Sequence, residues 1–175
     1  MPKQTETGEF TDPRDGKTYK TVKIGEQVWF AENLNWEGAG VCYNDDPDNG
    51  VKYGRLYTWN EALVAAPPGW HLPTDDEWQK LVDFAGGNDV AGNKLRAKDG
   101  WDGNGTDDFG FLAFPGGYLG RVGGFARVGR LGGWWSTTKR DSETAYYWRM
   151  DSGDASFCRY DYYDDGSYSV RLAQD

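Results

Sequence analysis

The chain has 175 residues, a formal net charge of −9, 25 glycines and an aromatic share of 16%. This length suits one domain with its own core, and the glycine and aromatic content favours short strands and tight turns over long helices. The acidic balance excludes nucleic acid as a partner, because the chain cannot build the basic stripe that phosphate binding needs. No run of 18 apolar residues occurs, so we expect no membrane-spanning helix.

The N-terminal stretch "MPKQTETGEFTDPRDG" lacks the apolar region of a signal peptide. We expect residues 1–9 to form a flexible segment and residues 10–175 to form a single domain. The compartment stays open: the protein works in the cytoplasm or a virion as written, or on a surface after removal of a leader. Cys42 and Cys158 are compatible with one disulfide or with two free thiols.

The first third of the chain predicts β-structure. The stretch "RDGKTYKTVKIGEQVWFAENL" (residues 14–34) has turn signals at Asp15–Gly16 and Gly25–Glu26, with near-alternating apolar residues between them. These features indicate a hairpin or meander. The following "NDDPDNG", residues 44–50, consists of helix and strand breakers and predicts a loop.

Two helices are expected next. In residues 54–69, one helical face would carry Leu56, Trp59, Leu63 and Val64, and Pro67–Pro68 would end the helix. In "LPTDDEWQKLVDFAGG", residues 72–87, Thr74 and Glu77 form a capping box, and Gly86–Gly87 supplies the stop. The buried stripe of this second helix would comprise Trp78, Leu81, Val82 and Ala85. Residues 91–97 predict one further helical turn.

Beyond Gly100 no helical period remains. Short strands are expected at residues 109–114 and 133–136, between Gly-Gly loops. Strands, then helices, then strands again predict an α+β fold in one domain.

Few residues suit catalysis. His71 is the single histidine, which excludes His-rich zinc sites, and its place before a helix cap favours a structural role. Cys158 lies among aromatic and acidic residues, which disfavour a reactive thiolate. Carboxylates are numerous but none has a defining spacing, so a glycosidase-like pair stays an alternative. Asp102, Asn104 and Asp108 are calcium candidates, although the pattern lacks the EF-hand glycine and glutamate and a solvated turn explains it equally.

The tail "AYYWRMDSGDASFCRYDYYDDGSYSVRL", residues 145–172, is rich in Tyr and Asp and poor in aliphatic residues. Its start suits a half-buried strand with Tyr146 and Trp148 on one side and Tyr147 and Arg149 on the other. That interpretation does not explain "CRYDYYDDGSY", where aromatic and acidic residues do not alternate. Tyrosines interleaved with Asp, Gly and Ser are typical of surfaces that contact a partner.

Six phrases, in this order, resemble the Fibrobacter-type major paralogous domain: "DPRDGKTYKTVKIGEQVWFAENLNW", "YGRLYTWNEAL", "PPGWHLPTDDEWQKLV", "NGTDDFGFLAFPGGY", "GGWWSTT" and "SVRL". The resemblance covers nearly all of residues 10–175. It implies a C-type-lectin-like fold of the formylglycine-generating-enzyme-like branch, with two main helices, short twisted antiparallel strands and Gly-rich loops. Members often have a lipoprotein leader and paired cysteines, whereas Ala66 stands at one cysteine position and the cysteines of the enzyme branch have no counterpart here.

Some such domains are variable proteins of diversity-generating retroelements, in which adenine-containing codons of a C-terminal segment are randomised. The resemblance implies a variable binding segment over residues 145–168. The positions implied to contact a ligand are Tyr147, Trp148, Arg149, Asp151, Gly153, Asp154, Ser156, Cys158, Tyr160, Asp161, Tyr162 and Tyr163. Trp148 departs from the pattern, because adenine changes in the first two positions of an Asn codon do not produce Trp.

Three hypotheses follow from the sequence. The first is a non-enzymatic domain without cofactor that binds a protein or glycan ligand through the diversified tail. The second is a fixed structural or surface paralogue, and the third is a carboxylate-based hydrolase.

Overall fold

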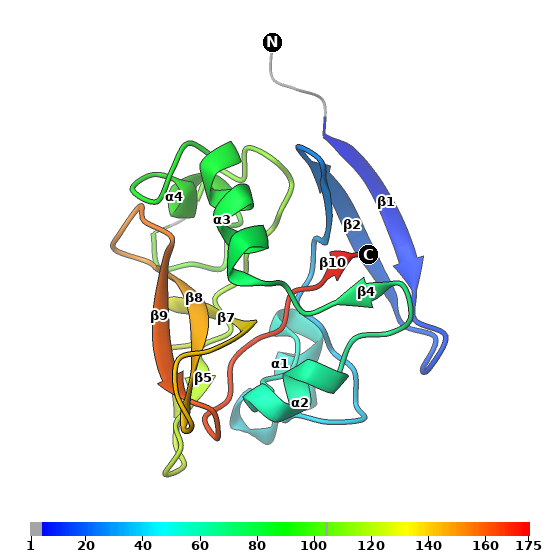
Figure 1. The fold of residues 1–175 in the computed structure, drawn as a ribbon, viewed down its shortest axis with the longest axis vertical. Coiled ribbons are helices and arrows are strands. Elements are labelled where there is room, and N and C mark those ends of the chain that lie inside the picture. Colours follow the sequence, from blue (N-terminus) through cyan, green and yellow to red (C-terminus); the bar gives the residue numbers. More distant parts are fainter. Residues whose placement is uncertain (1–4, 104) are drawn as a thin grey trace.

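A computed structural model describes residues 5–103 and 105–175. Two antiparallel sheets stand side by side, with helices above and below the space between them (Figure 1). The first sheet contains β1 (Glu6–Thr11), β2 (Thr18–Ile24), β3 (Gln27–Phe30), β10 (Ala173–Gln174) and β4 (Trp70–His71), in that order. The second contains β7 (Leu131–Lys139), β8 (Thr144–Asp151) and β9 (Cys158–Tyr163). A small hairpin joins β5 (Tyr118–Leu119) to β6 (Phe125–Ala126).

The helices are short. They are the 3-10 helix η1 (Tyr43–Asp45) and the α-helices α1 (Pro47–Tyr53), α2 (Trp59–Val64), α3 (Asp75–Phe84) and α4 (Ala91–Leu95). The α+β class predicted from the sequence is therefore confirmed, with few helices and antiparallel sheets.

Helix α3 matches its prediction closely. Thr74 caps it by accepting a hydrogen bond from the Glu77 backbone N–H at 3.2 Å, and its apolar stripe is fully buried. The reciprocal half of the capping box is missing, because the Glu77 carboxylate instead contacts the Thr74 hydroxyl and His71. The complete capping box occurs on α2, where Thr58 and Glu61 satisfy each other's backbone N–H groups.

Four expectations were wrong. Residues 44–50 contain η1 and the start of α1, because Asp46 caps α1 and Pro47 occupies its first turn, where a missing N–H costs nothing. Of the apolar face predicted for α2, only Leu63 and Val64 are exposed: Leu56 is buried but precedes the helix, Trp59 is half-buried against the core, and the buried residue of the helix is Ala62. Residues 109–114 make only an isolated bridge at Ala113. The sheet already begins at Glu6, so residues 6–9 belong to β1 and not to a flexible segment; residues 1–4 lie outside the described residues.

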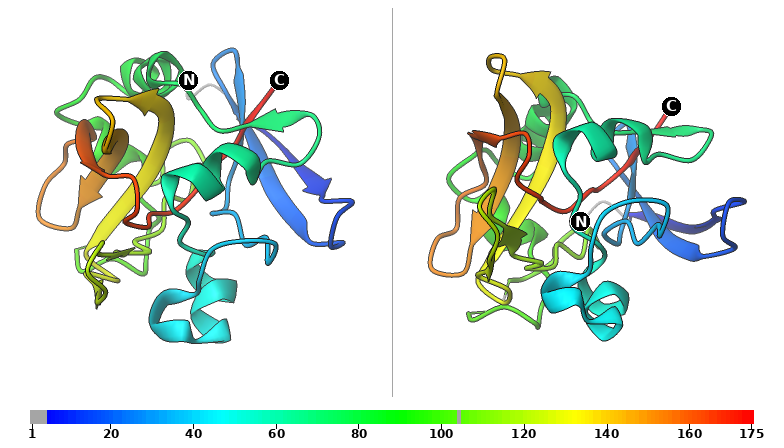
Figure 2. Two further views of the ribbon diagram at one scale, coloured as in Figure 1. Left: turned by 60° about the horizontal axis from the view of Figure 1, so that its bottom comes forward. Right: turned by 90° about the horizontal axis from the view of Figure 1, so that it is seen from below.

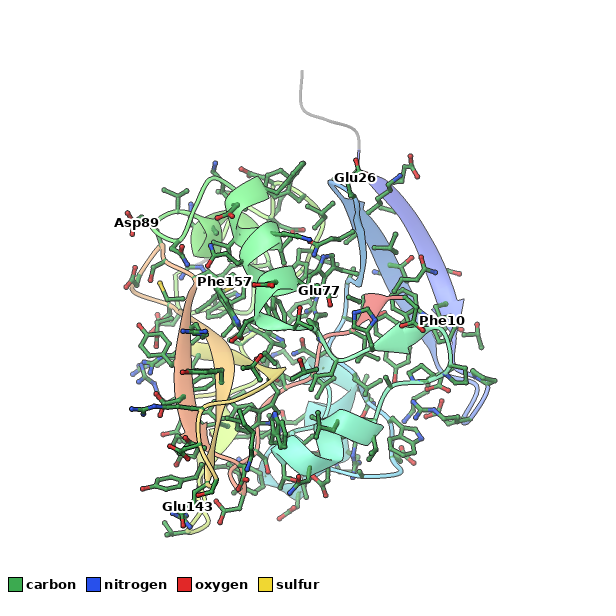
Figure 3. The ribbon with its side chains drawn as sticks, in the orientation of Figure 1. Phe10, Glu26, Glu77, Asp89, Glu143 and Phe157 are labelled. Carbon is green, nitrogen blue, oxygen red and sulfur yellow. The ribbon has the colours of Figure 1, made fainter. Side chains whose placement is uncertain are left out.

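Two apolar clusters form the core, and the β7–β8 pair separates them. Trp134 pairs with Trp148 and packs toward α3, together with Phe157, which Figure 3 labels beside α3. The next pair, Trp135 and Tyr147, packs on the opposite side of the sheet in the second cluster. Since successive residues of a strand point to opposite faces, β8 is buried on both faces at Tyr147 and Trp148.

The chain after β9 runs between the two sheets, which Figure 2 shows from two further directions. It contacts both sheets. The Ser169 backbone N–H donates to the Gly133 carbonyl of β7 and the Ser169 carbonyl accepts from the Trp135 N–H. The carbonyl of Leu172 accepts from the Phe30 backbone N–H of β3. Arg171 is fully buried here. Its guanidinium donates to the Asn33 side chain and to the carbonyls of Phe30, Phe111 and Leu112. This segment therefore connects the sheet that carries β9 to the rest of the molecule.

Candidate functional site

The predicted binding segment does not form one surface. It comprises most of β8, the loop of residues 152–157, β9 and the turn that follows. Tyr147 and Trp148, both predicted to contact a ligand, are 4% and 2% exposed. Tyr147 stacks on Tyr168 with ring centroids 4.2 Å apart, and the Trp148 indole N–H donates to Asp75 at 3.0 Å. These two residues are therefore part of the core.

The loop before β9 holds three of the predicted residues, Gly153, Asp154 and Ser156. Gly153 and Asp154 are exposed and Ser156 is half-buried. The Asp154 carboxylate accepts the Ser156 backbone N–H at 2.9 Å, and this bond lowers the pKa of Asp154. The loop is thus ordered by a local Asx turn, at the opposite end of β9 from Tyr163.

Strand β9 displays the exposed part of the segment. Tyr160 and Tyr163 are 46% and 39% exposed, Arg159 is exposed, and Asp161, Tyr162 and Cys158 are half-buried. We define the β9 surface as these side chains, which project from both faces of the edge strand, together with two from the neighbouring strand and two from adjacent loops. The β9 surface comprises Arg121, Arg140, Tyr146, Arg149, Cys158, Arg159, Tyr160, Asp161, Tyr162 and Tyr163.

Arginines lie against the rings of this surface. The guanidinium carbon of Arg159 is 4.1 Å from the Tyr146 ring centroid, that of Arg149 is 5.3 Å from Tyr160, and that of Arg121 is 3.9 Å from Tyr163. Such contacts are attractive and hold both partners in one geometry. The tyrosines therefore stand in fixed positions before a partner arrives.

Carboxylates orient the same arginines. Arg159 donates to Asp75 of α3 at 2.9 Å, and Arg140 donates to Asp161 at 2.9 Å. Arg149 donates to Asp151, and this bond raises the pKa of Arg149; Asp151 also accepts from Arg127 at 3.0 Å. The predicted site residues Arg149 and Asp151 thus form an ion pair at the end of β8 nearest the loop.

Beneath the surface the tyrosines form a continuous cluster. The ring centroid of Tyr160 lies 6.2 Å from that of buried Tyr147. The ring centroid of Tyr162 lies 5.6 Å from that of buried Tyr168 and 6.1 Å from that of Tyr118 in β5. Burial raises the pKa of Tyr168, so its hydroxyl stays protonated. The exposed rings are thus supported by buried ones of the same kind.

Several members of this surface were not predicted from the sequence. Tyr146 and Arg159 lie inside the quoted tail, and an antiparallel register through the 152–157 loop would have placed them close together. Arg121 and Arg140 come from separate segments of the sequence. Only the folded chain brings them to β9, so no local pattern could have revealed them.

The two calcium candidates that the structure describes, Asp102 and Asp108, belong to no metal-binding group of side chains. Asp102 faces the Arg130 guanidinium at 3.4 Å, and the Asp108 backbone N–H donates to the Lys94 backbone carbonyl; Asn104 lies outside the described residues. Within residues 5–103 and 105–175, no group of three or more His, Cys, Asp or Glu side chains could hold a metal ion.

Cys42 and Cys158 are both free thiols. Cys42 lies near Arg55, at 3.4 Å from its guanidinium, whereas Cys158 begins β9. His71 sits between two carboxylates, with ring nitrogens 2.7 Å from Glu77 and 2.8 Å from Asp175. These contacts link α3 to the end of the first sheet.

Two cavities accompany these features. One of about 280 Å³ adjoins β9 and is lined by Asp75, Asp76, Gln79, Asn88, Trp148 and Arg159. Another of about 600 Å³ separates the β1–β2 hairpin from residues 107–112, and its lining includes Glu9, Lys20 and Asp107. Burial raises the pKa of Asp107, whose carboxylate accepts from the Leu112 backbone N–H at 3.0 Å.

Residues 22–174 match the family described as the Fibrobacter succinogenes major domain. The chain belongs to this family. The match begins within β2 and ends in β10, so this Fibrobacter succinogenes major domain includes the β7–β9 sheet and the whole β9 surface, and leaves out β1 and the first part of β2. No curated protein and no solved structure matches the chain. In the described part of the domain, no helix is long and apolar enough to cross a membrane.

Proposed function

We propose that this protein is a ligand-binding domain that contacts a protein or glycan through the β9 surface. The observation that carries the proposal is the exposure of Tyr160 and Tyr163 on a strand whose neighbours Tyr147 and Trp148 are buried. A tyrosine has only two rotatable side-chain bonds, so fixing it on binding costs little entropy. The proposal involves no catalytic step and no cofactor.

The arginines of the surface add directional polar contacts to the apolar area of the rings. Tyr and Arg are the residue types that dominate binding energy at protein interfaces. Because each arginine is already held by a ring or a carboxylate, little conformational freedom is lost when a partner binds.

We further propose that the scaffold is C-type-lectin-like and that the tail is diversified by a retroelement. An α+β architecture with β1 and β10 in one sheet supports the first part. The second part is supported by where the candidate positions lie: ten of the twelve lie outside the core, and Tyr147 and Trp148 are the two exceptions. Trp148 is also the residue that departs from the codon pattern.

The binding role is tested by replacing Tyr160 and Tyr163 with Ala, singly and together. Both side chains lie outside the two core clusters, so the free energy of unfolding should fall by no more than about 1 kcal/mol. Binding to ligands selected from immobilised glycan and peptide libraries should fall at least tenfold in the double variant. Val122→Ser, at a side chain that is 94% exposed, serves as the surface control. Undiminished binding by the double variant would remove the β9 surface from the proposal.

Diversification is tested on the DNA of several isolates. We expect differences concentrated at adenine-derived codons between Tyr147 and Tyr163, with a reverse transcriptase gene nearby. A uniform tail with no template repeat would instead identify a fixed binding or structural module.

The hydrolase alternative is favoured by one observation. The cavity lined by Glu9 and Asp107 contains a carboxyl group whose pKa is raised by burial, as general acids require. Screening the wild-type chain and Asp107→Asn against glycosides and esters decides the matter. Turnover that disappears in Asp107→Asn would establish the alternative, and no turnover by the wild type would reject it.

A further inference from the structure

The direction of the backbone groups in the β7–β9 sheet follows from one contact. The Trp135 N–H donates to the Ser169 carbonyl, and the Ser169 N–H donates to the Gly133 carbonyl. The backbone N–H and C=O groups of Gly133 and Trp135 therefore point away from β8. Those of Trp134, the residue between them, point toward its partner Trp148 in β8.

The same alternation continues across β8. The backbone N–H and C=O of Trp148 point toward β7. Those of its neighbours Tyr147 and Arg149 therefore point toward β9, where the paired residues are Tyr160 and Cys158. The backbone groups of residues 158, 160 and 162 thus form hydrogen bonds with β8. Those of Arg159, Asp161 and Tyr163 point away from β8, toward the outside of the sheet. The Asp164 N–H, which donates to the Glu143 carbonyl, agrees with this assignment.

The outer edge of β9 is unpaired. β9 is the last strand of its sheet and forms the outer side of the molecule in Figure 1. Within the described residues, the outward N–H groups of Arg159, Asp161 and Tyr163 have no hydrogen-bond acceptor. The Tyr163 carbonyl does accept the Gly166 N–H at 3.0 Å, which leaves the carbonyls of Arg159 and Asp161 free. The edge therefore offers five backbone groups to an added strand.

The charges along this edge are asymmetric. The Arg159 side chain is 47% exposed and its partner Asp75 only 15%, while Arg140 is 54% exposed and its partner Asp161 35%. The guanidinium groups thus reach further into solvent than the carboxylates that hold them. An approaching chain meets positive charge and tyrosine first, although the whole protein is acidic.

We propose that the ligand of the β9 surface is an extended peptide with acidic side chains, which adds to the free edge of β9 as a fourth strand. This inference rests on the proposed function and names its partner class. Backbone bonds to Arg159, Asp161 and Tyr163 supply affinity, and the tyrosines and arginines beside the edge select alternate side chains of the peptide. A glycan has no strand backbone and could not use these groups.

A second copy of this chain fits the edge less well than such a peptide. In the antiparallel self-pairing that matches all three outward residues, Arg159 faces Tyr163 and Asp161 faces Asp161 of the copy. Like charges directly opposite each other across two strands are destabilising. The repulsion disfavours this self-pairing and leaves the edge open to a different chain.

The test uses a phage-displayed library of random decapeptides selected on the immobilised full-length chain. The decisive variant is Asp161→Pro, which removes an outward N–H and no bond of the sheet, so an edge strand tolerates it. Asp161→Ala is the matched control, because it removes the same carboxylate and keeps the N–H. Selected peptides should contain Asp or Glu at alternate positions. They should bind Asp161→Pro at least tenfold more weakly than Asp161→Ala, and this difference isolates the N–H because both variants lack the Asp161 carboxylate and its contact with Arg140.

Hydrogen exchange on the wild-type chain gives a second readout that needs no variant. The amides of Arg159, Asp161 and Tyr163 should exchange fast in the free protein and become protected when a selected peptide is added. The amides of Tyr160 and Tyr162 should be protected in both states.

Several results would overturn the inference. Equal binding by Asp161→Pro and Asp161→Ala, or no protection of the outward amides, would show recognition through side chains alone. Loss of binding in the Tyr160 and Tyr163 variants would then still support the proposed function. Selection of no peptide, or formation of a dimer that protects the same amides without peptide, would also exclude an acidic peptide as the added strand.

Discussion

At the scale of single residues, burial separates side chains of the same type. Tyr147 and Tyr160 are paired across β8 and β9, yet the first is 4% exposed and the second 46%. The difference comes from Tyr168, which covers Tyr147 and leaves the ring of Tyr160 at the outer edge. The two rings therefore contribute to different properties, stability for Tyr147 and recognition for Tyr160.

Trp148→Ala should lower the free energy of unfolding by about 3–5 kcal/mol, because it removes a buried ring from the contacts with Phe157 and leaves a cavity. Tyr163→Ala should cost no more than about 1 kcal/mol. Urea denaturation followed by tryptophan fluorescence and circular dichroism measures both. Similar losses for the two variants would mean that Tyr163 also belongs to the core.

At the scale of elements, α4 positions the loop that leads into β9. The Asn93 N–H donates to the Ala155 carbonyl at 3.1 Å, and Asn88 both donates to and accepts from the backbone of Phe157. Gly92 permits this close approach, because a Cβ atom there would lie 2.2 Å from the Ser156 carbonyl oxygen. The start of β9 is thus fixed by a helix that contributes no side chain to the β9 surface.

Gly92→Ala should therefore destabilise the protein by about 2 kcal/mol or more, because backbone atoms must move apart. The matched control is Gly153→Ala in the same loop, where an added Cβ would meet no atom within 4 Å. Thermal unfolding and hydrogen exchange of residues 154–158 compare the two variants. If Gly92→Ala behaves like Gly153→Ala, the loop is not held by α4.

At the scale of the whole molecule, the two sheets are joined by the segment that follows β9. Arg171 donates to the carbonyl of Phe30 at the end of β3 and to that of Leu112 in the middle of the chain, and burial lowers the pKa of Arg171 to about 9. His71 adds a second connection between α3 and Asp175. The β9 surface is consequently attached to a scaffold that spans the whole sequence.

The His71 connection predicts a pH dependence. Burial opposes protonation of His71, but hydrogen bonds to Asp175 and Glu77 outweigh it and raise the pKa. The folded chain therefore binds this proton more tightly than the unfolded chain. The resulting stability is complete below the unfolded pKa of about 6.5 and is lost as pH rises through the folded pKa.

Solvent screens this partly exposed group, so the contribution should stay below about 1 kcal/mol. We expect the stability difference between wild type and His71→Gln to be larger at pH 6 than at pH 9, as measured by urea denaturation. Glu26 and Lys80 line a cavity together with Glu77 and Asp175, the two partners of His71, and are unchanged in the comparison. A difference that is independent of pH would show that His71 acts through packing alone.

Local patterns of the sequence determined much of the fold. The turns at Asp15–Gly16 and Gly25–Glu26 define the β2–β3 region, and Thr74 with the stripe from Trp78 to Ala85 defines α3, because caps, turns and helical periodicity act between residues close in the chain. The Tyr- and Asp-rich composition of the tail also indicated where an exposed surface would lie.

Only the tertiary structure decided which tail residues are accessible. Tyr147 and Trp148 became core residues because both faces of β8 are covered, one by α3 and the other by Tyr168, and neither partner is near β8 in sequence. The arginines that line β9 and the outward direction of its free backbone groups likewise depend on contacts between distant segments. Sequence composition predicted that a surface exists, whereas long-range packing determined its members and its free edge, since burial depends on what the folded chain places opposite each residue.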